Sequence, residues 1–386
     1  MRLADVAAIN PKLTKRPDVQ EMISFVPMAG VDAEAATVSS EPRAFNEVRK
    51  SYTLFEDGDL LLAKITPCFE NGKIAQASLG YRTGAGSTEF HVIRPDLRQL
   101  DSRYLLHFLR QPSIRALGER RMTGSGGQRR VPEAFVAELK LPLPNVTDQQ
   151  RIADVLDRLA DLRAMRREAV AMLTDLERSV FLDMFGDPGR NPHSWPILRV
   201  ENLLDSASYG TSEKASLVGD VAVLRMGNLT YEGSLDLTDL KYLPSAVVED
   251  RHLVRAGDVL FNRTNSADLV GKTATYRGQD PMAYAGYLVR LRVNEHANPE
   301  YLSAYLNTRY CKRVLRGMAK SIVGMANINA KEVQGIAIPK PPLSLQEKFA
   351  NRIMQIERLR SDLRVHLAEL DALFASLQDK AFRGGL

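Results

Sequence analysis

The chain has 386 residues, of which 44% are hydrophobic and 26% charged, the composition of an ordinary globular protein with room for two or three domains. Its 52 Lys and Arg against 47 Asp and Glu give a net charge of +5, which permits an acidic partner such as DNA without requiring one. Two isolated cysteines exclude a disulfide framework, and the lack of a long apolar run or a signal-peptide core predicts a soluble cytoplasmic protein with no membrane partner.

The first predicted domain covers residues 1–144 and carries mixed α and β signals. Strand-like runs lie at residues 60–65 and 89–95, and a helical run follows at residues 102–121. A glycine-rich loop comes next, at residues 123–130. This order predicts a sheet with a helix and a flexible loop beside it.

A long helix is predicted at residues 145–186. Apolar residues recur there in alternating steps of three and four, the spacing of a heptad seam. Thr147 followed by Gln150 has the spacing of a capping box, and Gly186 stands just beyond the end. The predicted seam comprises Ile152, Val155, Leu159, Leu162, Leu173 and Leu176.

The second predicted domain, residues 187–341, repeats the mixed pattern. Its strand-like runs lie at residues 221–226, 258–263 and 287–293. The helical run lies at residues 299–318 and the loop at residues 320–327. A second long helix is predicted at residues 342–386, with Ser344 and Glu347 as its capping box. Its predicted seam comprises Phe349, Ile356, Leu359, Leu363, Leu370 and Leu373.

The two halves are one unit that occurs twice. GDLLLAKITPCFENGK from Gly58 matches GDVLFNRTNSADLVGK from Gly257, an offset of 257 − 58 = 199 residues. From Tyr104 against Tyr301 the offset becomes 301 − 104 = 197 and holds to the end of the chain. The segment from Leu13 to Gly58 aligns poorly with its counterpart. Two binding domains of different specificity would show this pattern, and so would neutral drift after a duplication.

The repeat predicts an α+β fold with two pseudo-symmetric mixed α/β domains, which the resemblance described below implies to be target-recognition domains, separated by a pair of long antiparallel coiled-coil helices. A helix with one narrow apolar stripe is not stable alone, so we expect the two helices to pack on each other. The first helix leads to the second domain, and the pseudo-two-fold then returns the C-terminus to the first. About 38 helical residues span roughly 57 Å, a fixed spacer between the domains.

The sequence gives little support for catalysis. Gly271-Lys272-Thr273 fails as a phosphate-binding loop because Ser266 stands where its first glycine is needed. Asn10-Pro11-Lys12 and Asn298-Pro299-Glu300 do not match the Asn/Asp-Pro-Pro-aromatic motif of adenine methyltransferases. The six histidines show no metal-ligand spacing, so we expect neither a catalytic nor a metal-binding residue.

Basic residues gather twice at the same offset, on the helical run and loop of each domain. Few acidic residues lie among them, which suits phosphate contact, although a solvated basic face has the same composition. The loop glycines allow close approach of a phosphate, Gln or Asn can pair with adenine, and Arg can pair with guanine. The candidate DNA-binding residues are Lys64, Lys73, Arg115, Arg120, Arg121, Gly126, Gly127, Gln128, Arg129, Arg130, Arg225, Asn228, Asn262, Arg263, Asn265, Lys272, Lys312, Arg313, Arg316, Lys320, Ser321 and Asn327.

Two variable domains, each followed by a long helix entered through Pro-x-Pro and then Thr or Ser, resemble the specificity subunits of type I restriction-modification systems. The segments that carry the resemblance are LPLPNVTDQQRIADVLDRLADLR, IPKPPLSLQEKFANRIMQIERLR, SFVPMAGVD, YGTSEKA and VLRMGNLTYEG. The first domain departs from the pattern, since it has Asn10-Pro-Lys-Leu-Thr where the second has Tyr209-Gly-Thr-Ser. The base-contacting residues of the first domain are therefore the harder to place.

The resemblance implies a non-catalytic DNA-binding subunit that recognises a split duplex site and docks two methyltransferase subunits, to which restriction subunits add. S-adenosylmethionine, ATP and Mg would then belong to those partners, with no cofactor on this chain. A coiled-coil interaction scaffold without DNA binding is one alternative, but it leaves the duplicated basic residues unexplained. A stand-alone DNA methyltransferase or nuclease is another, against which the missing motifs speak.

Overall fold

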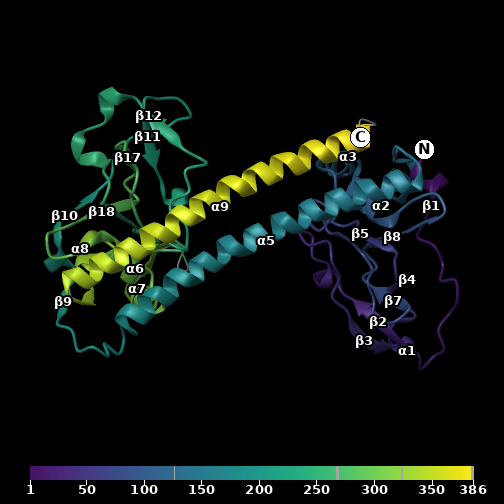
Figure 1. The fold of residues 1–386 in the computed structure, drawn as a ribbon, viewed down its shortest axis with the longest axis horizontal. Coiled ribbons are helices and arrows are strands. Elements are labelled where there is room, and N and C mark those ends of the chain that lie inside the picture. Colours follow the sequence, from purple (N-terminus) through teal and green to yellow (C-terminus); the bar gives the residue numbers. More distant parts are fainter. Residues whose placement is uncertain (126, 267–268, 323–324, 384–386) are drawn as a thin grey trace. The chain divides into compact units, whose positions relative to one another are not determined.

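The computed structural model describes residues 1–125, 127–266, 269–322 and 325–383, with only the backbone described at residues 320–322. The chain forms two compact units (Figure 1). Unit 1 combines Met1–Arg167 with Val365–Leu386, and unit 2 is Glu168–Arg364. Each long helix is therefore divided, with one stretch in each unit.

Unit 1 contains two four-stranded sheets. The first is antiparallel throughout and has the order β1 (Ala7–Ile9), β8 (Phe90–Pro95), β5 (Leu60–Ala63), β6 (Ile74–Gln76). The second has the order β3 (Glu41–Ala44), β2 (Met22–Val26), β7 (Thr83–Gly86), β4 (Thr53–Glu56), with β2 and β7 parallel. All four residues of β5 are buried, as expected for a central strand covered on both faces.

Unit 2 repeats both sheets in the same order. The antiparallel sheet is β10 (Leu204–Tyr209), β18 (Leu288–Val293), β14 (Val259–Asn262), β16 (Thr273–Thr275). The mixed sheet is β12 (Lys241–Leu243), β11 (Val221–Leu224), β17 (Met282–Tyr284), β13 (Leu253–Val254), again with its β11 and β17 parallel. The mixed sheets include the segment whose sequences align poorly, so the topology has survived where the sequence has drifted.

Two smaller sheets complete the strands of unit 2. They are β15 (Thr264–Asn265), β20 (Met325–Asn327), β19 (Lys320–Ile322), and the pair β21 (Ala337–Pro339) with β9 (Ile197–Arg199). Short 3-10 helices lie at Leu3–Asp5, Met28–Gly30, Val200–Leu203, Met226–Asn228, Ser245–Val247 and Asp250–His252.

Each helical run predicted as one helix is two helices. In unit 1, α2 (Ser102–Leu109) and α3 (Pro112–Arg121) are separate because Pro112 cannot continue a helix but fits the first turn of a new one. In unit 2, Thr308 caps α7 and so divides the run in the same way. The remaining helices are α1 (Phe45–Val48), α4 (Glu133–Glu138), α6 (Pro299–Asn307), α7 (Arg309–Met318) and α8 (Ala330–Gln334).

Three hydrogen-bonded contacts occur in both units at equivalent positions. The first is a two-bond ion pair across the antiparallel sheet, Arg94–Asp59 in unit 1 and Arg292–Asp258 in unit 2. The second joins a helix tyrosine to a proline carbonyl upstream of the long helix: Tyr104 to Pro142 at 3.0 Å and Tyr301 to Pro339 at 2.6 Å. In the third, buried Gln149 and Gln346 accept from the backbone N–H at Asp101 and Asn298. The second and third contacts fix the start of each long helix to its own domain.

The long helices are α5 (Val146–Phe185) and α9 (Leu343–Arg383). The predicted capping boxes are wrong, because both helices begin before the predicted cap residues. At α5 the side chain of Asn145 accepts from the Asp148 backbone N–H at 2.9 Å, so Asn145 provides the cap instead of Thr147. Ser344 likewise lies inside α9.

The predicted heptad seams are only partly buried. Ile152, Leu159, Leu173, Phe349, Ile356 and Leu363 are less than 10% exposed and Leu370 is half-buried, whereas Val155, Leu162, Leu176, Leu359 and Leu373 are 41–49% exposed. The buried stripe of α9 instead runs through Phe349, Ile353, Ile356, Arg360 and Leu363, in steps of four and three. Arg360 interrupts the apolar pattern of this stripe, so the sequence pattern predicted the neighbouring Leu359 as the seam residue.

Within each unit a stretch of α5 lies antiparallel to a stretch of α9 (Figure 1). In unit 1, Arg163 of α5 pairs with Asp371 of α9 and lies 4.4 Å from the ring of Phe374. In unit 2, Arg360 of α9 pairs with Glu177 of α5 at 2.8 Å. Arg163 and Arg360 are equivalent (360 − 163 = 197), as are Glu177 and Phe374. The α+β class with two mixed units and a long antiparallel helix pair is therefore confirmed.

The last phenylalanine of each repeat packs in the core of the unit that contains the other repeat's sheets. Phe382 lies 5.0 Å from the ring of Tyr104 in unit 1, and Phe185 lies 4.8 Å from the ring of Tyr301 in unit 2. These are the same contact at the repeat offset, 382 − 185 = 197. Each unit thus needs a helix stretch from the other repeat to complete its core.

We expect Phe185→Ala to lower the free energy of unfolding by about 3 to 5 kcal/mol, because it empties a site enclosed by aromatic rings. Leu176→Ala, on the same helix but 45% exposed, should change it by less than about 1 kcal/mol. Urea unfolding of the full chain measures both. Equal effects of the two substitutions would contradict this assignment of the buried face.

Candidate nucleic-acid interface

In unit 1 the exposed predicted residues gather at the C-terminal end of α3 and on the loop after it. Arg120 and Arg121 form the last turn of α3 and are exposed, and Gly127, Gln128 and Arg129 are exposed on the loop. Gly126 lies outside the described residues. Among the described residues, no carboxylate pairs with Arg120 or Arg121, so both positive charges face solvent, as phosphate contacts require.

Arg130 is held in a fixed orientation. Its guanidinium donates from Nε to Glu89 Oε2 at 3.0 Å and from Nη2 to Glu89 Oε1 at 2.8 Å. These hydrogen bonds lower the pKa of the Glu89 carboxyl, so the pair stays ionised at neutral pH. Lys64 lies beside it, since its backbone N–H donates to the Glu89 carbonyl at 2.9 Å. The Arg130 side chain remains 42% exposed.

At the equivalent place in unit 2, the guanidinium of Arg263 lies 4.7 Å from the ring centre of Tyr209. Its Nη2 donates to Asn327 Oδ1 at 3.2 Å. The Tyr209 hydroxyl accepts from the Ala330 backbone N–H at 3.0 Å, which holds the ring in place. The sequence singled out Arg263 and Asn327 but missed Tyr209 and Glu89. Tyr209 could have been found, because it opens the segment that the first domain lacks.

The remaining predicted residues of unit 2 lie in less uniform settings. Arg313 and Arg316 are exposed on α7, and Asn265 is half-buried in β15. Arg225 pairs with Asp239 at 2.8 Å. Lys320 and Ser321 pair through their backbones with β20, and their side chains lie outside the described residues. In unit 1, Lys73 donates to the Met28 carbonyl at 2.9 Å.

Residues 1–170 match the family described as the type I restriction modification DNA specificity domain. The chain is 43% identical over 159 residues to the type I restriction enzyme EcoEI specificity subunit of Escherichia coli, a match covering 41% of this chain and 27% of that subunit. It is 25% identical over 336 residues to the EcoKI specificity subunit of E. coli K12, covering 82% and 72%.

The resemblance to type I specificity subunits that the sequence suggested is confirmed. The matched segment spans only about a quarter of the EcoEI and EcoAI subunits, 27% and 26% of their lengths.

Two solved structures share the fold over the whole chain. The S subunit of a type I restriction-modification system from M. genitalium aligns with a TM-score of 0.58 and 13% identity, covering 99% of this chain and 95% of that one. A chain from a study of complex assembly and conformational transition in the type I R-M system aligns with a TM-score of 0.57 and 22% identity, covering 100% and 97%. At these identities the likeness establishes the fold.

Four of the predicted DNA-contacting residues are buried instead. Asn228, Asn262, Lys272 and Lys312 are 3%, 0%, 9% and 9% exposed. Asn228 donates to the carbonyls of two loop residues, and Lys312 donates from Nζ to the Gly271 carbonyl at 2.5 Å. We therefore replace the expectation of direct DNA contact by a structural role at these four positions. A sequence pattern does not reveal burial of this kind, because burial depends on the tertiary packing around each side chain.

The duplicated Gly-Lys pair has a structural explanation. Gly72 and Gly271 have φ values of +71° and +82°, which favour glycine. In each unit a basic residue of the following helix packs against this turn. A Cβ on Gly72 would lie 2.9 Å from Nη1 of Arg115, which is equivalent to Lys312 in unit 2 (312 − 115 = 197). Arg115 is thus a half-buried packing residue as well as a DNA candidate.

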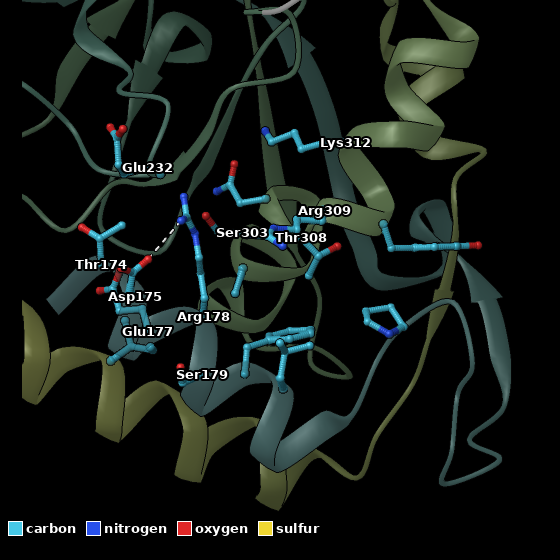
Figure 2. Close-up of a pocket in the computed structure, with 18 of the residues that line it drawn as sticks. Thr174, Asp175, Glu177, Arg178, Ser179, Glu232, Ser303, Thr308, Arg309 and Lys312 are labelled. Atoms are coloured by element: carbon cyan, nitrogen blue, oxygen red, sulfur yellow. Dashed lines mark hydrogen bonds and ion pairs between the residues drawn. The ribbon is translucent and has the colours of Figure 1, made fainter. Parts of the chain in front are cut away.

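A pocket of about 1030 Å³ lies within unit 2, lined by α5, α6, α7, the start of α9 and residues 231–233. Figure 2 shows Lys312 and Arg309 on one side, with Asp175, Glu177 and Arg178 from α5 across from them. Asp175 pairs with Arg178, and Glu177 pairs with Arg360. At the repeat offset of Arg309, Arg313 and Arg316, unit 1 has Pro112, Ala116 and Glu119, so the basic wall is not duplicated.

The described residues hold neither a metal-binding cluster of side chains nor a membrane-spanning helix. No group of three or more His, Cys, Asp or Glu side chains among them is placed to hold a metal ion. No helix in the described ranges is long and apolar enough to cross a membrane.

Burial lowers the pKa of the Lys312 ammonium to about 8 from 10.5. Between those pH values the unfolded chain holds a proton that the folded chain lacks, so this lysine adds stability as pH rises. Relative to Lys312→Met, the wild-type chain should gain on the order of 1 to 3 kcal/mol between pH 7.5 and pH 10.5. Urea unfolding at both pH values measures the difference. A constant difference between the two proteins would show that Lys312 titrates normally.

Proposed function

We propose that this chain is the specificity subunit of a type I restriction-modification system, acting in the cytoplasm without catalysis of its own. The observation that carries the proposal is the duplication of one specificity-domain topology, sheet for sheet, within a single chain. Two copies of one reading domain with different surface residues suit a split duplex site whose halves differ in sequence. The sequence relatives named as specificity subunits support the same role.

Phosphate contact falls to the exposed basic residues. In unit 1 these are Arg120 and Arg121, with Arg129 beside them in a 3.5 Å ion pair with Glu70, and in unit 2 Arg313 is the clearest counterpart. A few such contacts supply sequence-independent affinity and fix the register of each unit on the duplex. The long helices α5 and α9 then act as the spacer between half-sites.

Methyltransferase subunits dock, in this proposal, on exposed apolar side chains of α5 and α9. We call these the outer stripe. In unit 1 it comprises Val155, Leu162, Met165, Val365 and Leu373, and in unit 2 Met172, Leu176, Met354 and Leu359, all 41–59% exposed. Apolar side chains that recur in both long helices are typical of a surface covered by another protein. Its recurrence in both units matches two methyltransferase subunits, which bind S-adenosylmethionine, while restriction subunits joining them bring ATP and Mg.

The deciding experiment is the N6-adenine methylation pattern of the host genome with and without this gene. Deletion should abolish methylation at one split motif, and the wild-type gene supplied in trans should restore it. The restored motif gives the two half-sites and the gap directly. Methylation that is unchanged by deletion would contradict the specificity role.

The docking proposal predicts the effect of a charge on the outer stripe. Leu162→Asp with Leu176→Asp, at residues 46% and 45% exposed, should reduce co-purification of methyltransferase subunits about tenfold or more, since desolvating a carboxylate there opposes binding. Leu97→Asp, 68% exposed in a turn of unit 1, is the matched control and should leave co-purification unchanged. Equal recovery with both proteins would exclude the outer stripe as the docking surface.

A further inference from the structure

The two units place the same three backbone positions together at the end of their antiparallel sheets. In unit 1 the Lys64 N–H donates to the Glu89 carbonyl at 2.9 Å, and the Lys64 carbonyl accepts from Val131 at 2.8 Å. In unit 2 the Arg263 N–H donates to the Tyr287 carbonyl at 3.0 Å, and the Arg263 carbonyl accepts from Ile328 at 2.9 Å. The side chains of Lys64, Glu89 and Arg130 therefore correspond to those of Arg263, Tyr287 and Asn327.

Among the described residues, each unit has one guanidinium in this place, but it comes from a different one of the three positions. In unit 1 it belongs to Arg130, at the third position, and in unit 2 to Arg263, at the first. The shared backbone has thus kept an oriented arginine while the residue supplying it has changed. A purely structural ion pair would be expected to keep its position, as Arg94–Asp59 and Arg292–Asp258 have done.

The supports occupy only part of each guanidinium. Glu89 occupies the Nε and Nη2 side of Arg130, Nη1 donates to the Gln128 carbonyl at the long distance of 3.5 Å, and the side chain remains 42% exposed. Nε of Arg263 is buried without a partner in the described part of the chain, which leaves its terminal nitrogens for an acceptor. The ring of Tyr209 covers one face of Arg263, and Asn327 accepts from its Nη2. An arginine whose side chain is already ordered loses little entropy when it forms two hydrogen bonds to a base.

We propose that Arg130 and Arg263 are the guanine-reading residues of the two units, positioned by Glu89 and by Tyr209 with Asn327. This inference rests on the proposed function and names the side chains that carry its specificity. Guanine presents O6 and N7 as two adjacent acceptors in the major groove, which match the two donors at the end of a guanidinium. Phosphate is the poorer match for Arg130, because Glu89 already offsets its positive charge.

The test uses the host system, with variants of the full chain restoring the deleted gene. Arg130→Lys keeps the charge but loses the two-donor geometry, so one guanine in one half of the methylated motif should become degenerate while the other half stays intact. Arg263→Lys should relax the opposite half only. With the purified complex, preference for guanine over adenine at that position should fall about 10- to 100-fold.

The positioning residues Glu89 and Tyr209 are tested by the positions of the methylated motif that their substitution relaxes. Glu89→Gln and Tyr209→Leu should relax the same positions as Arg130→Lys and Arg263→Lys, with the other half unchanged, and Glu89→Asp should partly restore specificity. The matched control is Arg120→Ala, which should weaken binding to all sequences alike, lower the salt dependence by about one counterion and leave the motif unaltered. A merely structural role of Glu89 would lower the melting temperature and weaken both half-sites together.

The outcomes separate this inference from the function on which it rests. If the wild-type chain directs methylation to a split motif and both Arg→Lys variants give that same motif, base reading by these arginines is overturned and the specificity role stands. Uniform weakening without a change of motif assigns the arginines to phosphate and also overturns it. If the wild-type chain directs no motif, the proposed function itself has failed.

Discussion

The structure depends on an exchange of helix ends between the two repeats. The core of unit 1 is completed by Phe382 against Tyr104, and the core of unit 2 by Phe185 against Tyr301. A domain of one repeat alone would leave this aromatic surface in water, at a cost of several kcal/mol. The duplication is therefore more than two domains in series, because neither unit has a complete core without the other repeat. This constraint explains why the long helices have kept a constant offset while the sheets have diverged.

Some contacts are the same in both units, and others differ between them. The sheet orders, the Arg94–Asp59 and Arg292–Asp258 pairs and the tyrosine-to-proline hydrogen bonds recur at equivalent positions. The polar residues at the ends of the antiparallel sheets do not recur at equivalent positions. A guanidinium held by a carboxylate in unit 1 is replaced by one held by a ring and an amide in unit 2. A rigid scaffold with variable terminal side chains lets the polar surface change without a change in the core, as the proposed reading of two different half-sites requires.

The charged residues between the two long helices also have different partners in the two units. Arg163 and Arg360 are equivalent, yet Arg163 meets the ring of Phe374 while Arg360, only 2% exposed, meets Glu177. Burial raises the pKa of the Glu177 carboxyl, and the ion pair with Arg360 opposes that shift. A buried pair of this kind adds little net stability, but removing either partner leaves a charge without compensation. Each helix stretch is therefore matched to its own neighbour, and the apolar residues of the outer stripe remain exposed.

The sequence by itself determined the repeat, the two long helices to within a few residues, five of the main strands and the resemblance to type I specificity subunits. All of these follow from short-range periodicity or from comparison of one half with the other. The tertiary structure decided which face of each helix is buried. Arg163 and Arg360 lie on the packed faces of the two helices, and their positions there are explained only by the acidic partners on the opposite helix. The tertiary structure also buried Asn262 and Lys312, and joined Arg130 to Glu89, 41 residues away. Polar residues look alike in a sequence, and what distinguishes a structural one from a DNA-reading one is the long-range contact that either occupies its donors or leaves them exposed.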